Sequence, residues 1–241
     1  MIRTPRSRLG TSFLVATFFI LLQATAAAAS KPHVISFGKW TTVPWSSDSA
    51  AADDKPLALK VRPLLLDARP KEFTFGPAHD VTDRLFVVGR AFRVNDSLPQ
   101  ESAIPPHWLW QRGGWLLVDR VTGRISPLNL PDFDASYSVA SWYRDYAAYC
   151  GLSDDGKRIY AVVAEINHRK PVVKWLTGEA KFSVETQQQQ IPDPGCKLTD
   201  WQRSPARVTF EADPTSKRTY VIRGHSVDLS TNEEDDEEAA K

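Results

Sequence analysis

The sequence predicts an all-β protein: an antiparallel meander that forms a sandwich, an open barrel or an incomplete propeller, preceded by a signal peptide. Three observations carry this prediction. Apolar and polar residues alternate along several segments with the period of two that is typical of half-buried strands. Glycine-containing turns separate these segments. Beyond the first 29 of the 241 residues, no segment keeps the 3.6-residue period of an amphipathic helix.

Residues 1–29 have the order of a secretory signal peptide. Arg3, Arg6 and Arg8 form a basic start, an apolar run follows over Thr11–Leu22, and the small residues Ala27–Ala29 end the segment. An uncleaved membrane anchor is the alternative, although the run is shorter than the ~20 residues that a spanning helix needs. We therefore expect export to a periplasmic or extracellular location, with no transmembrane helix after cleavage.

Charge argues against a nucleic-acid partner. Removal of residues 1–29 takes three of the 30 Lys and Arg and none of the 29 Asp and Glu, which leaves a nearly neutral chain. Nucleic-acid binding normally needs a concentrated basic face. Six acids stand together at Glu233–Glu238, so residues 227–241 are expected to be a disordered acidic tail. Residues 30–56 are predicted as an N-terminal strand with a polar linker, and residues 57–226 as a single β domain.

Cys150 and Cys196 are the two cysteines of the chain. An even number in an exported protein favours a disulfide, and two free thiols or half of a metal site are the alternatives. Neither cysteine lies in a CxxC pair or has a histidine at ligand spacing, which argues against metal.

Three strands are predicted first, one in the N-terminal segment over Val34–Val43 and two at the start of the domain over Leu57–Leu66 and Arg84–Val94. Each alternates in the period-two pattern or is rich in β-forming residues. Polar and proline-rich stretches at 46–55 and 95–107 predict loops between them.

A β-hairpin is predicted next, because Gly113-Gly114 separates two apolar runs and glycines supply the positive φ angles of two-residue turns. In that register Trp108 to Arg112 pair with Trp115 to Arg120. One face then carries Trp108, Trp110, Arg112, Trp115, Leu117 and Asp119. A second turn at Val121–Gly123 continues the meander.

A third hairpin is predicted over Tyr146–Leu152 and Arg158–Ile166, joined by Ser153–Lys157. Both strands are apolar at nearly every position, so they should be central. The phrases WLLVDRVTGRISPL and YCGLSDDGKRIYAVVAEI resemble blades of exported bacterial β-propellers over residues 115–166. This resemblance implies a meander of short strands.

In the last third, a polar loop is predicted after Lys170–Trp175, over Glu185–Asp200, and Cys196 would pin this loop to Cys150. A terminal hairpin over Ala206–Glu211 and Arg218–Arg223 follows.

The candidate ligand-binding residues are Trp108, Trp110, Arg112, Trp115 and Asp119. Exposed aromatic rings on a sheet stack on sugars or planar groups, while charged neighbours orient polar substituents. The alternative interpretation is that the tryptophans pack in the core. A second aromatic cluster either rims a cleft or packs against the sheet; it contains Tyr137, Trp142, Tyr143, Tyr146 and Tyr149 around Arg144 and Asp145.

No catalytic, metal or cofactor motif is recognised. His79-Asp80 with Asp83, and Glu165 with His168, are the short-range groupings of possible ligands, and both are better interpreted as surface polar residues. Gly224–Asp228 begins like an esterase nucleophile elbow but lacks its final glycine.

The leading hypothesis is an exported, non-enzymatic β domain that binds an unidentified protein or carbohydrate, or joins an envelope or extracellular assembly. The alternative is a hydrolase of carbohydrate or envelope material that uses acids such as Asp119, Asp145 or Asp154, brought together across a cleft by folding.

Overall fold

The computed structural model describes residues 33–45, 57–95, 108–180, 195–223 and 226–230. The signal-peptide prediction, the loop predictions at 46–55 and 96–107, and the acidic run at 233–238 lie outside these residues. The described elements are all strands, which confirms the all-β class. None of them is a helix with the length and apolarity to span a membrane.

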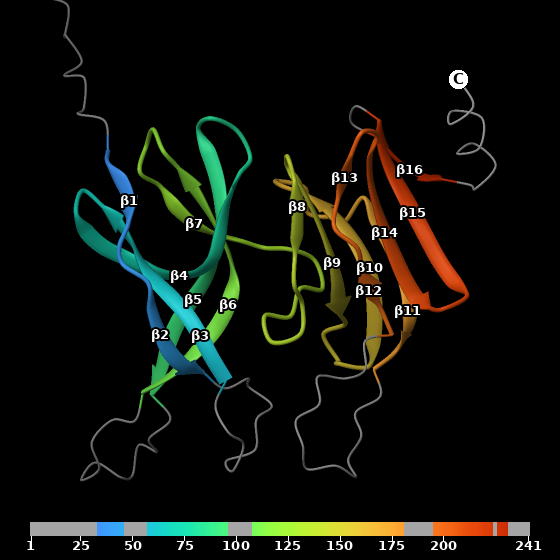
Figure 1. The fold of residues 1–241 in the computed structure, drawn as a ribbon, viewed down its shortest axis with the longest axis horizontal. Coiled ribbons are helices and arrows are strands. Elements are labelled where there is room, and N and C mark those ends of the chain that lie inside the picture. Colours follow the sequence, from blue (N-terminus) through green and yellow to red (C-terminus); the bar gives the residue numbers. More distant parts are fainter. Residues whose placement is uncertain (1–32, 46–56, 96–107, 181–194, 224–225, 231–241) are drawn as a thin grey trace, which may run out of the picture. The chain divides into compact units, whose positions relative to one another are not determined.

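The first sheet, sheet A, has seven strands (Figure 1). Its order is β1-β3-β2-β6-β5-β4, with β7 paired to β6 and β3 also paired to β4. The strands are β1 (Ile35–Phe37), β2 (Thr41–Trp45), β3 (Leu57–Leu66), β4 (Arg69–Asp80), β5 (Leu85–Asn95), β6 (Trp108–Asp119) and β7 (Ile125–Leu128). The prediction for Leu57–Leu66 is confirmed, and the predicted strand at 34–43 is two strands.

Five of these strands, β2 to β6, form a closed ring. Each pairs antiparallel with the next along the chain, and β2 pairs with β6 in parallel through Trp45 and Trp110. The parallel bridge follows from the count, because the first and last strands of an odd up-and-down series run in the same direction. Closure removes the free edges that an open sheet would leave on β2 and β6.

Sheet A is apolar on both faces. One cluster is built from Leu64, Phe86, Val88, Leu116 and Val118. The other contains Trp45, Leu59, Val61 and Ala91, with Phe73, Phe75 and Trp110 packed against it. Because alternate residues of β5 contribute to different clusters, the ring is held by packing from both sides.

The predicted hairpin at Gly113-Gly114 is wrong. β6 runs unbroken from Trp108 to Asp119 and pairs along its length with β5. Arg112 lies opposite Ala91 and Trp115 opposite Gly89, so the two glycines occupy a β-bulge and not a turn. A Cβ on Gly113 would lie 3.2 Å from the carbonyl oxygen of Arg90. Gly113 therefore serves close backbone approach.

Strand β4 has no counterpart among the predicted strands. The turn before it is made by Asp67 and Ala68, both at positive φ (51° and 63°). Asp67 supports the turn, since its carboxylate accepts hydrogen bonds from the Val34 amide and pairs with the His33 ring at 2.8 Å. The sequence lacks the glycine or asparagine that normally marks such a turn.

Sheet B is a four-stranded antiparallel meander in the order β11-β10-β9-β8 (Figure 1). Its strands are β8 (Ser141–Tyr143), β9 (Tyr146–Leu152), β10 (Arg158–Glu165) and β11 (Val173–Glu179). The predicted third hairpin is confirmed as β9 and β10, and both are central. Both faces of β9 and β10 are buried, as their nearly continuous apolar sequences indicate.

Sheet C has the order β12-β14-β15-β16, with β13 paired to β14. Its strands are β12 (Lys197–Leu198), β13 (Gln202–Arg203), β14 (Ala206–Asp213), β15 (Ser216–Arg223) and β16 (Ser226–Ser230). The predicted terminal hairpin is present as β14 and β15. A further strand follows it, so the segment predicted as a tail from residue 227 begins within β16.

Sheets B and C share one core and a covalent link. Tyr146, Ile159 and Ala161 of sheet B belong to the same buried cluster as Val208 and Phe210 of sheet C. The predicted disulfide is confirmed: Cys150 on β9 is bonded to Cys196, just before β12, with 5.9 Å between their Cα atoms. These two sheets therefore pack face to face as in a sandwich.

Candidate ligand-binding cleft

The tryptophans of the predicted ligand face do not form one exposed platform. Trp108 is 54% exposed. Trp110 is half-buried with its ring centroid 5.0 Å from that of Phe73, and Trp115 is half-buried against Trp142, also at 5.0 Å. Edge-to-face pairing of this kind is the usual packing of buried aromatic rings. Of the three tryptophans, Trp108 alone offers a largely free ring.

Arg112 and Asp119 have separate partners. The Arg112 guanidinium lies over the Phe75 ring, 5.0 Å from its centroid, and donates to the carbonyl oxygen of Ser138. Burial lowers the pKa of Arg112, and the charge of Asp134 opposes this shift. Asp119 accepts two hydrogen bonds from Arg84.

Asp119 also stabilises the turn that follows it. Its carboxylate accepts hydrogen bonds from the amides of Val121 and Thr122. The hydrogen bond from Arg84, followed by these amide bonds, holds the pKa of Asp119 well below its usual range, against a smaller opposing effect of desolvation. Asp119 thus stabilises the fold through Arg84 and the turn. No contact between Arg112 and Asp119 is present among the described residues.

The second aromatic cluster divides between core and surface. Tyr149 is fully buried and its hydroxyl donates to the carbonyl oxygen of Pro131 at 2.5 Å. Burial raises the pKa of Tyr137 to about 12. Trp142 and Tyr143 are half-buried and reach a surface pocket, together with Arg144.

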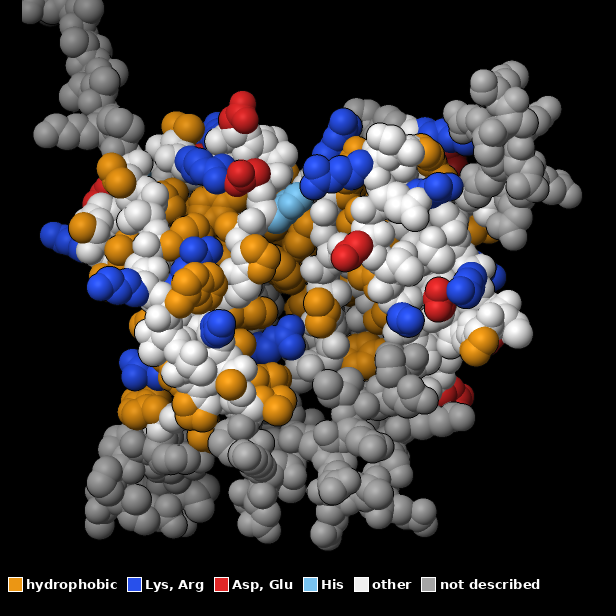
Figure 2. Space-filling model, viewed as in Figure 1, with side chains coloured by type: hydrophobic (Ala, Val, Ile, Leu, Met, Phe, Trp, Pro, Cys, Tyr) orange, Lys and Arg blue, Asp and Glu red, His pale blue; other side chains and the backbone are white. Residues whose placement is uncertain are grey.

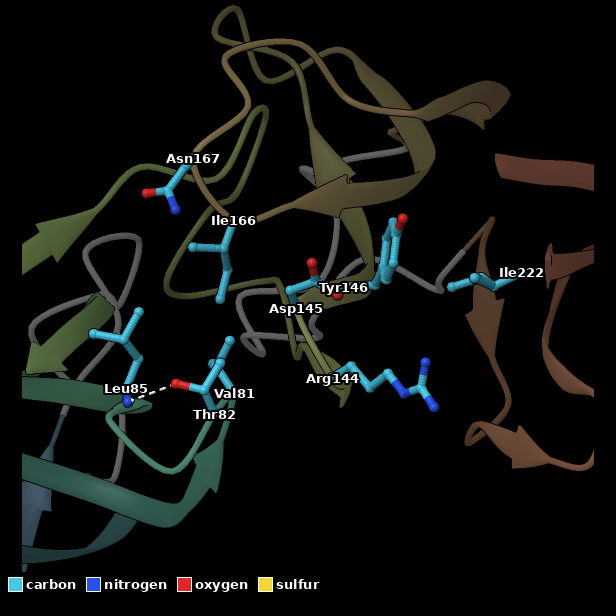
Figure 3. A pocket seen from close by; sticks show the side chains of 9 residues that line it. All are labelled: Val81, Thr82, Leu85, Arg144, Asp145, Tyr146, Ile166, Asn167 and Ile222. Atoms are coloured by element: carbon cyan, nitrogen blue, oxygen red, sulfur yellow. Dashed lines mark hydrogen bonds between the residues drawn. The ribbon is translucent and has the colours of Figure 1, made fainter. Parts of the chain in front are cut away.

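Two adjoining pockets meet at Val81 and Arg144, which line both. We call the pair the Arg144 cleft. The first pocket has a volume of about 480 Å³ (Figure 3) and is lined by Val81, Thr82, Leu85, Arg144, Asp145, Tyr146, Ile166, Asn167 and Ile222. The second has a volume of about 550 Å³ and is lined by His79, Asp80, Val81, Ser141, Trp142, Tyr143, Arg144, Asp200, Trp201 and Arg203.

Arg144 occupies the tight turn between β8 and β9, where Tyr143 pairs with Tyr146. Its φ is 51°, in the left-handed region that is uncommon for residues other than glycine, asparagine and aspartate. His79 of β4 holds this turn from outside, because its Nε2 lies 2.8 Å from the Arg144 carbonyl oxygen. A carbonyl oxygen only accepts, so Nε2 of His79 is the donor of this hydrogen bond.

Aromatic rings from three strands or loops border the second pocket. The His79 ring stacks on Trp142 with centroids 5.8 Å apart and an interplanar angle of 22°. Tyr143 lies 5.5 Å from Trp201 at 32°. The indole of Trp201 donates to the Ser141 carbonyl oxygen at 3.1 Å, which fixes its orientation. These contacts preorganise the aromatic wall before any ligand arrives.

The charged groups of the second pocket differ in how they are satisfied. Asp80 pairs with Arg120 at 2.5 Å, and Asp200 accepts a hydrogen bond from the Ser141 hydroxyl at 3.3 Å. Arg144 and Arg203 are both exposed. Within the described part of the chain, neither arginine has an ion pair with a carboxylate.

The first pocket contains a buried hydroxyl. Tyr146 is 2% exposed, and its Oη has no hydrogen-bond partner among the described residues. Burial raises the pKa of Tyr146, and the charges of Glu165 and Asp145 raise it further. In Figure 3 the Arg144 side chain extends toward Ile222 of sheet C, while Asp145 and Tyr146 follow it along the chain.

Sequence reasoning identified only part of this cleft. Trp142, Tyr143 and Arg144 belong to the predicted second cluster. His79 was considered only as a metal ligand, and Asp200, Trp201 and Arg203 were not identified. The dipeptide Asp200-Trp201 beside Cys196 was the available signal, because the disulfide fixes that segment against sheet B.

The described residues contain no group of three His, Cys, Asp or Glu side chains placed to hold a metal ion. Glu165 and His168 do meet, with 2.9 Å between Oε2 and Nδ1, because the turn after β10 brings them together. Figure 2 shows Lys and Arg spread over one face of the molecule, with hydrophobic side chains gathered over sheet A.

Comparison with protein-family models, with curated proteins and with solved structures finds no match to this chain.

Proposed function

We propose that this protein is an exported, non-enzymatic binding domain that holds carbohydrate in the Arg144 cleft. The observation that carries the proposal is the aromatic wall made by Trp142, Tyr143 and Trp201 beside Arg144 and Arg203, neither of which has a carboxylate partner among the described residues. Sugar rings present apolar faces that stack on aromatic side chains, and their hydroxyls need a few fixed polar partners. The second pocket supplies both kinds of group.

The exported location is supported by two independent features. The basic, apolar and small-residue regions of residues 1–29 have the order of a signal peptide. The disulfide between Cys150 and Cys196 is of the kind that persists in oxidising compartments.

Binding is favoured over catalysis by the engagement of the acids. Of the three acids named for hydrolysis, Asp119 is held by Arg84, Asp154 lies in the turn after β9, and Asp145 lines the first pocket. General acid–base chemistry on a glycoside needs two carboxylates that face each other across the scissile bond.

The test is glycan binding by the protein without residues 1–29, measured on a glycan array and then by calorimetry. Tyr143→Ala is expected to weaken binding at least about tenfold, because a stacking surface is lost. Trp108→Ala is the matched control, since Trp108 is an exposed tryptophan outside the cleft. Failure to bind any glycan contradicts the proposal, and loss of binding in Trp108→Ala but not Tyr143→Ala moves the site to β6.

A hydrolase is the second candidate, because Asp80 and Asp200 line the same pocket. Incubation of the bound glycan with the protein, followed by chromatography, distinguishes the two. Release of shorter products that Asp200→Asn abolishes establishes catalysis. Unchanged glycan supports binding alone.

A further inference from the structure

We infer that the Arg144 cleft selects acidic sugars, and that Arg144 and Arg203 together recognise the carboxylate of a uronic acid. This inference rests on the proposed carbohydrate-binding function. It goes further by naming the chemical class of the ligand and the residues that select it.

Arg144 and Arg203 differ in their ion pairing from other arginines of the same molecule. Arg84, Arg90 and Arg120 each pair with a carboxylate, to Asp119, Glu72 and Asp80 respectively. Over the residues that the structure describes, Arg144 and Arg203 have no such partner, yet both line one pocket. Two arginines without a carboxylate partner, beside an aromatic wall, are complementary to a ring that carries a negative charge.

The neighbouring acids leave an excess of positive charge in the second pocket. Asp80 is neutralised by Arg120, and Asp200 keeps its charge while it accepts a hydrogen bond from the Ser141 hydroxyl. Asp145 lines only the first pocket, and the His79 ring is committed to the Arg144 carbonyl through Nε2. Among the described residues of the second pocket, two guanidinium groups therefore stand against the single charge of Asp200, and this balance favours an anionic ligand.

The backbone of Arg144 also distinguishes this residue. A residue with a side chain at φ 51° is strained relative to glycine. Its side chain is exposed, and its one described contact is with the Tyr143 ring, 5.5 Å from the guanidinium carbon. Packing thus does not explain why position 144 is an arginine, whereas recognition of a ligand explains it.

Guanidinium geometry indicates a carboxylate. The planar fork of arginine donates two parallel hydrogen bonds to the two oxygens of a carboxylate. Tyr143 lies beside Arg144 and close to Trp201, so a sugar ring stacked on the aromatic wall places its substituents near the arginine.

The probe is oligogalacturonate, compared with the same oligomer after complete methyl esterification, which removes the charge and leaves the ring. The protein without residues 1–29 is expected to bind the acid at least about tenfold more tightly than the methyl ester, since one bidentate pair is worth more than 1.4 kcal/mol. Arg144→Gly is expected to abolish this preference without lowering the melting temperature, because glycine relieves the positive φ. Arg203→Ala should reduce the preference for the acid over the ester. Arg144→Lys should keep only part of this preference, because lysine retains the charge but not the planar fork.

Three controls separate the possible failures. Arg124→Ala removes an exposed arginine outside the cleft, and an equal loss there would show non-specific charge attraction and overturn the inference. Equal binding of the acid and its ester overturns the acidic selectivity while the carbohydrate-binding function stands. Equally tight binding of dextran sulfate overturns carboxylate selection. Binding of neither charged nor neutral glycans contradicts the proposed function itself.

Discussion

The ring of β2 to β6 and the pair of sheets B and C reach stability by different means. Each strand of the ring has a hydrogen-bonded neighbour on both sides, so the ring has no edge. Sheets B and C are open meanders, and each keeps edge strands. They are joined by a shared core and by the Cys150–Cys196 disulfide.

The comparison shows where a cross-link is useful. Hydrogen bonds close the ring, so that every strand is fixed by its neighbours. Among the described strands no ladder connects sheet B to sheet C, so the way these two sheets fit together depends on side-chain packing and the covalent bond. We therefore expect the stability of sheets B and C to fall when a core side chain is truncated or the disulfide is reduced. The ring should be destabilised when an added atom overpacks its interior.

Truncation of Phe210 should have the largest effect. Phe210 is fully buried in the core that sheets B and C share, so Phe210→Ala is expected to lower the free energy of unfolding by about 3–5 kcal/mol. Chemical denaturation measures the change. Leu229→Ala, at a position 49% exposed, should change it little. A loss below about 1 kcal/mol would show that the two sheets do not depend on this core.

Removal of the disulfide should come next. Cys150→Ala with Cys196→Ala opens a connection of 46 residues, for which the chain-entropy model gives about 4 kcal/mol, with smaller losses common in practice. Hydrogen exchange should show increased opening of β9 and β14 with little change in β3 and β5. Uniform loss of protection across all three sheets would show that the disulfide stabilises the ring as much as it stabilises sheets B and C.

Crowding of the ring should cost less. A Cβ on Gly89 would lie 2.7 Å from the Phe75 ring, so Gly89→Ala is expected to destabilise by about 1–3 kcal/mol. Thermal denaturation gives the value. Gly114→Ala is the matched control, since no atom lies within 4 Å of its added Cβ. Equal effects at both positions would mean that packing against Phe75 is unimportant.

The turn between β3 and β4 should respond in the opposite direction. Ala68 lies at φ 63°, so Ala68→Gly is expected to stabilise the protein by up to about 1 kcal/mol as strain is relieved. Ala58→Gly, within β3, should destabilise it instead. A lower melting temperature for Ala68→Gly would indicate that the gain in unfolded-state entropy outweighs the strain.

The pattern of apolar residues and turn residues predicted those strands that are defined by their own sequence. β3 follows from alternation, and β9 and β10 follow from apolar runs around an Asp-Gly turn. β6 was misinterpreted because two adjacent glycines are also the signature of a hairpin, and only the partner strand β5 shows that they form a bulge. β4 was missed because its turn uses Asp67 and Ala68, which carry no glycine signal.

The cleft was less predictable for a different reason. His79, Trp142 and Trp201 come from three sheets or their connections, and the contacts among these regions depend on how the sheets pack. No spacing along the chain encodes that packing. The tryptophan face of β6 had the stronger sequence signal, but Trp110 and Trp115 are used against Phe73 and Trp142.

The parallel bridge between Trp45 and Trp110 has a consequence for the order of folding. As the chain is synthesised, β3, β4 and β5 each find their partner in the strand just completed, whereas β2 must wait for β6. Contacts between distant segments form slowly, since a long connection must first be closed. During that interval one side of β2 is an open edge, able to pair with another molecule. β2 contains Pro44, which has no N–H group to donate, so β2 has fewer hydrogen bonds to offer to any ladder.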